Sequence, residues 1–442
     1  MKEPIACLAV ILLACTFSVA ESKRTNIVLL MADDMGMEAI GAHGGESYRT
    51  PHIDKLANEG VRFDNCFANP LCTPSRTKIM TGQYNVRNYE KFGRLPRREK
   101  TFAHALKDAG YATAIAGKWQ LGSEKDAPQH FGFDEAFLWY HIGNGRHEGG
   151  IDGRFVNPVV AINGEPKHFR DGEYGPQKCT DFICDFMERN RKHPFLVYYP
   201  MILTHCPFDP TPDSSDWDPK RAGSKTYKGP GTKADQQRHF GDMVNYADKI
   251  VGQLVAKLDA LGLRNNTLII FTGDNGTDKP IVSQWNGRTV VGGKGKMDDT
   301  GTRVPCVVSW PISMKGGRVS DQLVDFTDVF PTLCEAAGVE LPEAYSGDGV
   351  SLLPVIRGEG NRSKPWVYVW YAGKTFARNH AYCVGGTHGK TSYTLTDVRK
   401  PFAPQPVANL KRNAEQNKNY QELLGVIQRL EKTRGNKPVP KR

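Results

Sequence analysis

Residues 71–82 read LCTPSRTKIMTG, and this stretch constrains the fold and chemistry of the chain more than any other. Pro74 suits the first turn of a helix, because the N–H group that proline lacks would have no partner there. We therefore expect Cys72 just ahead of a helix that runs through Arg76 and ends near Gly82. The free N–H groups and positive dipole of a helix start favour an anion or a nucleophile's negative charge. A thiol placed there should be acidified and reactive; the alternative is a buried, unreactive cysteine.

Strands and helices alternate on both sides of this stretch. Residues 26–31 form a continuous apolar run ending in charge, which is typical of a buried parallel strand. Further strands are expected at 111–116, 195–199 and 267–272, and helices at 53–60, 102–109, 181–190 and 234–261. This pattern predicts an α/β fold with a large mixed, mostly parallel sheet between layers of helices. Ligands of such sheets collect at the carboxyl ends of the strands.

Oxygen-bearing side chains follow two of the expected strands. Asp33 and Asp34 come directly after the first, and Asp274 and Asn275 come after the strand at 267–272. Adjacent carboxylates repel each other unless a cation joins them, so the pair invites a hard divalent ion; a solvated turn is the alternative. An all-oxygen ligand set favours Ca²⁺ or Mg²⁺ over zinc, which prefers His or Cys.

The stretch 71–82 resembles the signature of the formylglycine-dependent (type I) sulfatases of the alkaline phosphatase superfamily, with its Cys-x-Pro-Ser-Arg core and trailing Thr-Gly. Further segments resemble motifs of that family in family order, over residues 26–305: TPHIDKLA at 50–57, AGKW at 116–119, THCP at 204–207, GGKG at 292–295 and RVP at 303–305. The resemblance implies an alkaline phosphatase-like fold and a sulfuric ester hydrolase.

In that family a dedicated formylglycine-generating enzyme oxidises the motif cysteine to an aldehyde, Cα-formylglycine (3-oxoalanine). The resemblance implies this modification at Cys72. It also implies one Ca²⁺ ion, with Mg²⁺ possible, held by position 72 together with Asp33, Asp34, Asp274 and Asn275.

The same resemblance assigns the catalytic and substrate-binding residues. Lys118 and Lys294 would bind the sulfate group, and Arg76 with the metal would favour the hydrated aldehyde, one hydroxyl of which attacks sulfur. His205 would protonate the leaving alcohol as a general acid, and the second hydroxyl would then expel sulfate. The chain departs from the family at Gln120, where a histidine is usual. Glutamine cannot take a proton, but it can hydrogen-bond the hydrate. Either His205 or a water then accepts the proton of the hydrate, or turnover is impaired.

Two other functions compete with sulfate-ester hydrolysis. Phosphomonoester or phosphonate monoester hydrolysis occurs in the same superfamily, although its phosphatases use a second metal with histidine ligands, and only one metal's ligands are found here. A degenerate sulfatase that only binds sulfated glycans is the other alternative, and Gln120 is the feature that favours it.

The first twenty residues have the pattern of a secretory signal. Lys2, an apolar stretch at 5–14 and the small residues of 18–20 predict cleavage near Ala20 and a secreted or periplasmic protein. A lipoprotein anchor at Cys15 is a poorer match, and no stretch is long enough to cross a membrane. Of ten cysteines, the eight in the mature part are too dilute for a disulfide framework, although Cys179 and Cys184 form a candidate pair.

The remaining composition bears on domains and partners. In 442 residues we expect a signal peptide (1–20), a catalytic domain (21–357) and a small C-terminal α+β subdomain (358–442), the last with strands at 366–371, 381–384 and 391–395 and a helix at 419–432. The net charge of +10 favours a polyanionic partner such as a sulfated carbohydrate, and no nucleic-acid-binding motif is found. Substrate choice is expected to depend on two loops. One is 138–154, which contains Trp139, Tyr140, His141, Arg146 and His147, and the other is 206–233.

Overall fold

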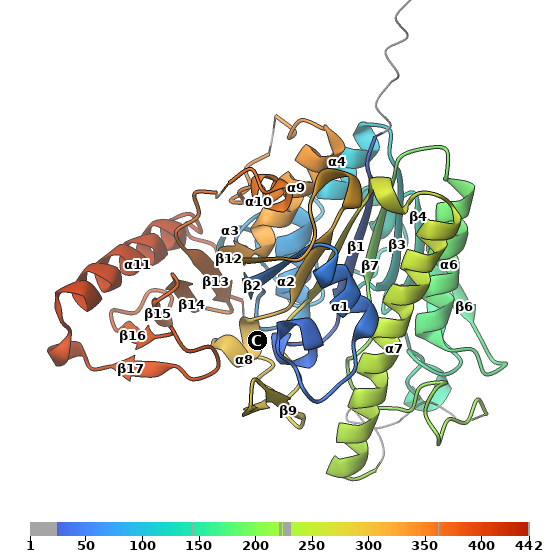
Figure 1. Cartoon of the computed structure of the whole chain (residues 1–442), viewed down its shortest axis with the longest axis horizontal. Helices are drawn as coiled ribbons and strands as arrows, with labels where there is room; N and C mark the ends of the chain where they lie inside the picture. Colours follow the sequence, from blue (N-terminus) through green and yellow to red (C-terminus); the bar gives the residue numbers. More distant parts are fainter. Residues whose placement is uncertain are drawn as a thin grey trace, which may run out of the picture.

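A computed structural model of the chain describes residues 24–142, 145–220, 223, 231–343, 345–360 and 362–440. The expected signal peptide, with Cys15 and the cleavage site near Ala20, lies outside the described residues. Ten strands form one sheet in the order β12-β2-β11-β8-β1-β7-β3-β4-β5-β6 (Figure 1). Their bounds in that order are Arg318–Asp325, Val61–Phe67, Cys306–Ser309, Thr267–Gly273, Asn26–Ala32, Phe195–Pro200, Ala112–Lys118, Glu135–Trp139, Val159–Ile162 and Glu165–His168. Only β11 and β5 of these ten run against the others, so the sheet is mixed and mostly parallel, as predicted.

Strand β1 shows why helices cover both faces of this sheet. Every residue of β1 is buried, and its side chains alternate between two hydrophobic cores, with Ile27 in one and Val28 in the other. One core is closed by α2 (Cys72–Thr81), α4 (Phe102–Asp108) and α9 (Val329–Ala337). The other is closed by α1 (Pro51–Asn58), α6 (Gly175–Arg189) and α7 (Lys233–Ala260) (Figure 1). Short helices α3 (Asn85–Asn88), α5 (Ala127–His130), α8 (Asp299–Thr302) and α10 (Leu353–Arg357) and the hairpin β9 (Val282–Trp285) and β10 (Arg288–Val291) complete this part.

The C-terminal region forms a second, antiparallel sheet. Its strands are β13 (Val367–Tyr371), β14 (Lys374–Arg378), β15 (Tyr382–Thr387), β16 (Thr394–Asp397) and β17 (Gln405–Val407), and α11 (Ala414–Lys432) packs on them. A third core joins this unit to the large one through Tyr84 and Tyr89 of the α3 region. In Figure 1, α11 lies at the opposite end of the molecule from α6. The expected α+β character is therefore present, while a boundary at residue 358 stays a prediction.

Two expectations about cysteines and membranes can be compared with the described residues. Cys179 and Cys184 both lie on α6 as free thiols, so they are helix residues and form no disulfide. Within the described chain, no helix combines the length and the apolar character that crossing a bilayer requires.

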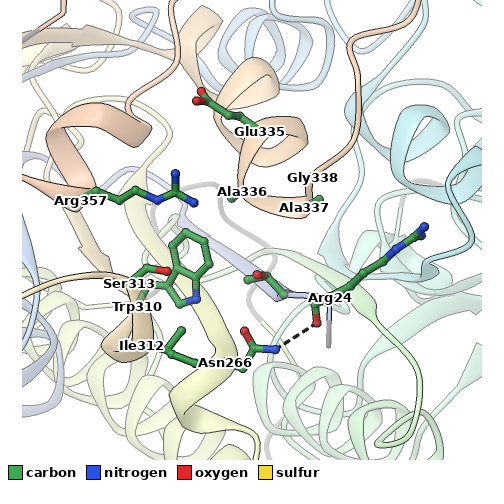
Figure 2. A pocket seen from close by; sticks show the side chains of 11 residues that line it. Arg24, Asn266, Trp310, Ile312, Ser313, Glu335, Ala336, Ala337, Gly338 and Arg357 are labelled. Atoms are coloured by element: carbon green, nitrogen blue, oxygen red, sulfur yellow. Dashed lines mark hydrogen bonds between the residues drawn. The ribbon is translucent and has the colours of Figure 1, made fainter. Parts of the chain in front are cut away.

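A broad hollow of about 760 Å³ lies at the edge of the sheet where β1 and β8 begin (Figure 2). Arg24 and Asn266 line it just ahead of these strands, and Asn266 donates a hydrogen bond of 3.1 Å to the carbonyl of Arg24. Trp310 and Arg357 lie on its other side, with the guanidinium 5.8 Å from the indole ring. This is the edge opposite the ends that carry Asp33 and Asp274, so the hollow is separate from the candidate site.

Candidate active site

The candidate site lies where four neighbouring parallel strands, β8, β1, β7 and β3, reach their carboxyl ends. Each strand, or the loop that follows it, contributes side chains to this edge. Asp274 and Asn275 follow β8, and Asp33 and Asp34 follow β1. His205 lies in the loop after β7, and Lys118 is the last residue of β3. Parallel neighbours deliver their ends to one place, which explains why residues so far apart in sequence meet.

Gly117 allows β3 to present Lys118 close to β7. Its φ is +115°, and a Cβ atom there would lie 2.1 Å from the carbonyl oxygen of Pro200. Only glycine tolerates both conditions. Backbone packing thus explains why glycine stands at position 117, directly before Lys118.

Helix α2 brings Cys72 and Arg76 to the same edge. The helix begins at Cys72 itself, one residue earlier than expected, because Pro74 occupies its third position and leaves the first turn intact. It ends at Thr81, where Gly82 adopts the left-handed conformation with φ of +66°. The Cys72 side chain is 2% exposed, and its Sγ donates to Oε1 of Gln120 across 2.8 Å.

The expected acidity of the Cys72 thiol is wrong. Burial raises the pKa of Cys72, and the favourable field of Lys118 does not offset it. Desolvation of a charged thiolate therefore outweighs the dipole of the helix start. As a thiol, Cys72 is protonated and hydrogen-bonded to Gln120, which makes it a poor nucleophile before any modification.

Four buried side chains surround the point where β1 and β8 end. The backbone N–H of Asp34 donates to Asp274 Oδ1 at 3.0 Å, and Asn275 Nδ2 donates to Asp34 Oδ1 at 2.8 Å. Asp34 has φ of +58°, a conformation that non-glycine residues rarely adopt and that recurs at functional sites. Asp33, Asp34, Asp274 and Asn275 are all fully buried.

Three cations compensate this buried negative charge. Lys118 Nζ lies 2.7 Å from Asp33 Oδ2, and Lys294 Nζ lies 2.5 Å from Asp34 Oδ2. Arg76 Nη2 lies 3.0 Å from Asp274 Oδ2, while its Nη1 donates to the Lys118 carbonyl at 2.9 Å. The two ammonium groups and the guanidinium thus converge on one cluster of carboxylates.

The carboxylates respond differently to this environment. Burial acts to raise the pKa of Asp33, but Lys118 and Arg76 outweigh it, so the pKa of Asp33 is lowered. Burial raises the pKa of Asp34 despite Lys294, and burial with the charge of Asp33 raises the pKa of Asp274. Burial and the closeness of the three carboxylates thus oppose their joint ionisation, and the three cations favour it.

The donor set fits a divalent metal ion. Ligand atoms of Asp33, Cys72 and Asp274 lie within 4.8 Å of one another, as do those of Asp33, Asp34 and His205. Within the described part of the chain, the buried oxygens Asp33 Oδ1 and Asn275 Oδ1 have no hydrogen-bond partner. Buried oxygens without a donor are costly unless a cation binds them. The side chains present therefore suit a hard ion, whose identity they leave open between Ca²⁺ and Mg²⁺.

His205 has a neighbour that the sequence did not predict. Arg154 Nη1 lies 2.7 Å from His205 Nδ1, and Asp152 holds the same guanidinium through contacts of 2.9 Å to Nε and 2.8 Å to Nη2. Nδ1 also lies against the backbone carbonyl of Cys206, so the guanidinium, which can only donate, favours a proton on Nε2, whereas that carbonyl favours one on Nδ1. Nε2 faces the site, 3.7 Å from Asp34 Oδ2. Burial, Lys294, Lys118 and Arg154 lower the pKa of His205 well below its usual value, so the ring is neutral.

The expected specificity loop divides between different parts of the surface. Tyr140 and His141 lie beside Gln120, whose backbone N–H donates to the Tyr140 carbonyl at 3.4 Å. Trp139 is buried and packs 4.4 Å from the Arg154 guanidinium, so core packing accounts for it. His147 instead contacts the carbonyl of Asn157 through Nε2 at 2.7 Å, and no contact links it to the site within the described residues. In the second loop, residues 221–222 and 224–230 lie outside the described residues, and 206–220 form no helix or strand.

Ten residues expected in the site therefore meet at one edge of the sheet: Asp33, Asp34, Cys72, Arg76, Lys118, Gln120, His205, Asp274, Asn275 and Lys294. Their individual catalytic and ligand roles remain predictions. Arg154 and Asp152 were missed, and no motif or spacing in the sequence signals their contact with His205.

The chain matches two family profiles and is similar to curated proteins. The sulfatase profile matches residues 25–339, and the profile of the C-terminal part of N-sulphoglucosamine sulphohydrolase matches residues 293–423. Mouse steryl-sulfatase is 32% identical over 429 residues, covering 77% of this chain and 66% of that protein. Human N-acetylgalactosamine-6-sulfatase is 32% identical over 383 residues, covering 79% of this chain and 69% of that protein. The chain thus spans about two thirds of the length of these relatives.

Solved structures share the fold. A protein crystallised with its substrate D-glucosamine-2-N,6-O-disulfate superposes with a TM-score of 0.73 at 24% identity, covering 95% of this chain and 100% of that one. The phosphonate monoester hydrolase of Agrobacterium radiobacter superposes with a TM-score of 0.66 at 19% identity, covering 94% and 96%. These likenesses confirm the predicted alkaline phosphatase-like architecture.

Proposed function

Because the chain belongs to the sulfatase family, as its sequence indicated, we propose that it hydrolyses the sulfate esters of a sulfated carbohydrate. Family membership places it among the sulfuric ester hydrolases. The observation that supports this activity best is the convergence of Lys118 and Lys294 on buried carboxylates beside Cys72. Such a site offers positive charge to a small anion at the position of a nucleophile.

One divalent ion, Ca²⁺ or alternatively Mg²⁺, belongs to this proposal. Asp33, Asp34, Asp274 and Asn275 would hold it with the modified residue 72, since their buried oxygens fit a hard cation. When bound, the ion supplies charge that stabilises an oxyanion and polarises the sulfate group. It would also allow the three carboxylates to ionise together, which the raised pKa values of Asp34 and Asp274 otherwise oppose.

Modification of Cys72 to formylglycine by a maturing enzyme is the second part of the proposal. The buried, protonated thiol is a poor nucleophile, whereas the hydrate of an aldehyde supplies one hydroxyl that attacks sulfur and another that expels sulfate. Gln120 lies 2.8 Å from Sγ, where its side chain would orient that hydrate without accepting its proton. Arg76 would hold the first turn of α2 against Asp274 while its charge favours an anionic oxygen.

Lys118, Lys294 and His205 complete the proposed mechanism. The two ammonium groups would turn from their carboxylates toward the sulfuryl oxygens, where negative charge grows in the transition state. His205 would present its Nε2–H to the leaving oxygen, as Arg154 occupies the other side of the ring. The leaving alcohol departs with this proton.

The carbohydrate substrate follows from similarity and charge. One structural neighbour was crystallised with a disulfated glucosamine, and the net charge of +10 attracts polyanions. The proposed place of action is outside the cytoplasm, secreted or periplasmic, on the basis of the N-terminal pattern of charge, apolar residues and small residues.

The test compares turnover of an aryl sulfate and an aryl phosphate by the purified protein, with mass analysis of the peptide containing Cys72. We expect preference for the sulfate, conversion of position 72, and loss of steady-state turnover in Cys72→Ser, because a serine sulfate has no second hydroxyl. Preference for phosphate would favour the monoester hydrolase alternative. An unconverted thiol, in a host that has the maturing enzyme, together with binding but no turnover, would favour the glycan-binding alternative.

A further inference from the structure

A second hollow, of about 280 Å³, opens directly beside the candidate nucleophile. Gln120 forms part of its wall, and the Oε1 atom of the same side chain lies 2.8 Å from Cys72 Sγ. Thr73, the next residue of α2, accepts a hydrogen bond of 3.1 Å from the N–H of Gly93, which also lines the hollow. Two residues of the wall, Gln120 and Gly93, are thus hydrogen-bonded to the first turn of α2, so the hollow lies one side chain away from Cys72.

The size and lining of the hollow suit a single sugar ring. Its volume lies just below the range of sites for drug-sized molecules. Phe92 lines it and is 38% exposed, an unusual state for a large aromatic ring, and Tyr140 lies beside Gln120 in the wall. Aromatic faces of this kind pack against the apolar faces of sugars while hydroxyl groups remain hydrated.

His141 adds an unsatisfied polar atom to this wall. The ring is 3% exposed, and its Nε2 lies 2.8 Å from the carbonyl oxygen of Glu124, which requires the proton on Nε2. Among the described residues, Nδ1 of His141 has no hydrogen-bond partner. This nitrogen is itself buried, so it is an unsatisfied acceptor behind the wall of the hollow.

The wall of the hollow carries two cationic side chains, Lys91 and Arg94, and one carboxylate, Glu124. Lys91 is exposed and forms no ion pair within the described residues, and Arg94 lies 3.6 Å from Glu124, with both side chains about half exposed. By contrast, the neighbouring Arg97, which does not line the hollow, is paired with Asp126 at 2.7 Å. Among the described residues, the ammonium group of Lys91 is thus left without a carboxylate partner at the hollow, while Arg94 shares a half-exposed pair with Glu124.

We propose that this hollow is the subsite for the sugar that carries the scissile sulfate, and that Lys91 and Arg94 bind a second anionic group of the same substrate. The proposal rests on sulfate-ester hydrolysis and deepens it. It names the substrate class as a sugar or oligosaccharide with at least two anionic groups, the second being a sulfate or a carboxylate. Phe92 and Tyr140 contact the sugar ring.

The experiment measures kcat and KM of wild type, Lys91→Ala and Arg94→Ala on three substrates. These are an aryl sulfate with one anionic group, a disulfated disaccharide, and a monosulfated disaccharide with a uronic acid. Each variant should lose about fivefold to tenfold in kcat/KM on the disaccharide with the better-placed second anion, mainly through KM. The kcat/KM value for the aryl sulfate should change less than about twofold, because this substrate has no second anionic group for Lys91 or Arg94 to bind.

Arg97→Ala is the matched control, since it removes a charge from the same segment outside the hollow. It should leave all three substrates unchanged, and the unfolding temperatures of all variants should match wild type because Lys91 and Arg94 are exposed. Comparison of the two disaccharides identifies the second anion as sulfate or carboxylate.

Equal losses on all three substrates, no loss in either variant, or a wild type that cleaves the aryl sulfate but neither disaccharide would overturn the subsite. A wild type that cleaves no sulfate ester at all would instead overturn the proposed function. The two failures are therefore distinguishable in one set of measurements.

Discussion

Replacement of Arg154 by methionine tests whether this residue acts on catalysis through His205. Arg154 Nη1 lies 2.7 Å from His205 Nδ1, while its guanidinium carbon lies 4.4 Å from the centroid of the Trp139 ring. Methionine keeps much of the apolar packing and removes the donor. A hydrogen bond from a charged donor contributes about 1.5–3 kcal/mol, so kcat should fall about 10- to 150-fold. KM should change little, because Arg154 is not placed to touch the sulfate.

A double-mutant cycle with His205→Ala is the assay. If Arg154 only orients and polarises the imidazole, then Arg154→Met combined with His205→Ala should lose no more activity than His205→Ala alone. Because Arg154→Met leaves the buried carboxylate of Asp152 unpaired, at a cost of about 3–5 kcal/mol, each Arg154→Met variant should also be made with Asp152→Asn. Urea unfolding then separates the catalytic loss from the loss of stability.

Arg189→Met is the matched control, since Arg189 also forms a bidentate pair, with Glu135, but on the exposed surface of α6. It should leave kcat unchanged and alter the free energy of unfolding by less than about 1 kcal/mol. Two results would refute the role of Arg154. One is additive losses in the cycle, and the other is full kcat in the Asp152→Asn, Arg154→Met protein.

Three further predictions concern charge in the interior. Arg76→Lys keeps the charge but cannot bind Asp274 and the Lys118 carbonyl together, so the free energy of urea unfolding should fall by about 3 kcal/mol, and a change below about 0.5 kcal/mol would contradict this. Addition of Ca²⁺ or Mg²⁺ should raise the unfolding temperature, with about 2.7 kcal/mol gained at 100 times Kd. Asp34→Asn should reduce this metal-dependent stabilisation, and an unchanged stabilisation would argue against Asp34 as a metal ligand. Lys78→Met should cost about 2 kcal/mol at pH 7, because burial alone would raise the pKa of Asp325, and Lys364 and Lys78 together lower it, so the variant removes one of its two cationic partners. The stability that the pair contributes is present above the pKa of Asp325 in the unfolded chain, and it is lost as pH falls toward the lower pKa of Asp325 in the folded protein. The loss of stability in Lys78→Met should therefore be smaller at pH 3.5 than at pH 7. An equal loss at both pH values would show that the charge pair is not its cause.

Much of the candidate site could be predicted because its residues belong to short segments with local physical causes. The apolar run before Asp33 forms β1, and Pro74 and Gly82 mark the first turn and the end of α2. Local patterns failed where the structural signal is weak or short. Strand β11 spans only Cys306–Ser309, and β12 contains an irregularity between Ser320 and Leu323, so neither strand was expected.

The acidity of Cys72 shows a different limit. The dipole of a helix start can be inferred from sequence, and it predicts an acidified thiol. Burial raises the pKa of Cys72 instead, and burial depends on every segment that packs around α2. The sign of the pKa shift was therefore a property of the tertiary structure.

The sequence by itself determined the family, the order of its motifs and the residues that gather at the strand ends, since these depend on residue type and on the parallel arrangement of neighbouring strands. Only the tertiary structure decided that Arg154 contacts His205, 51 positions away, and that Lys91 and Arg94 border a hollow beside Gln120. Such contacts join loops from different strands. Their geometry is set by how the loops pack on one another, and no local periodicity or spacing encodes it.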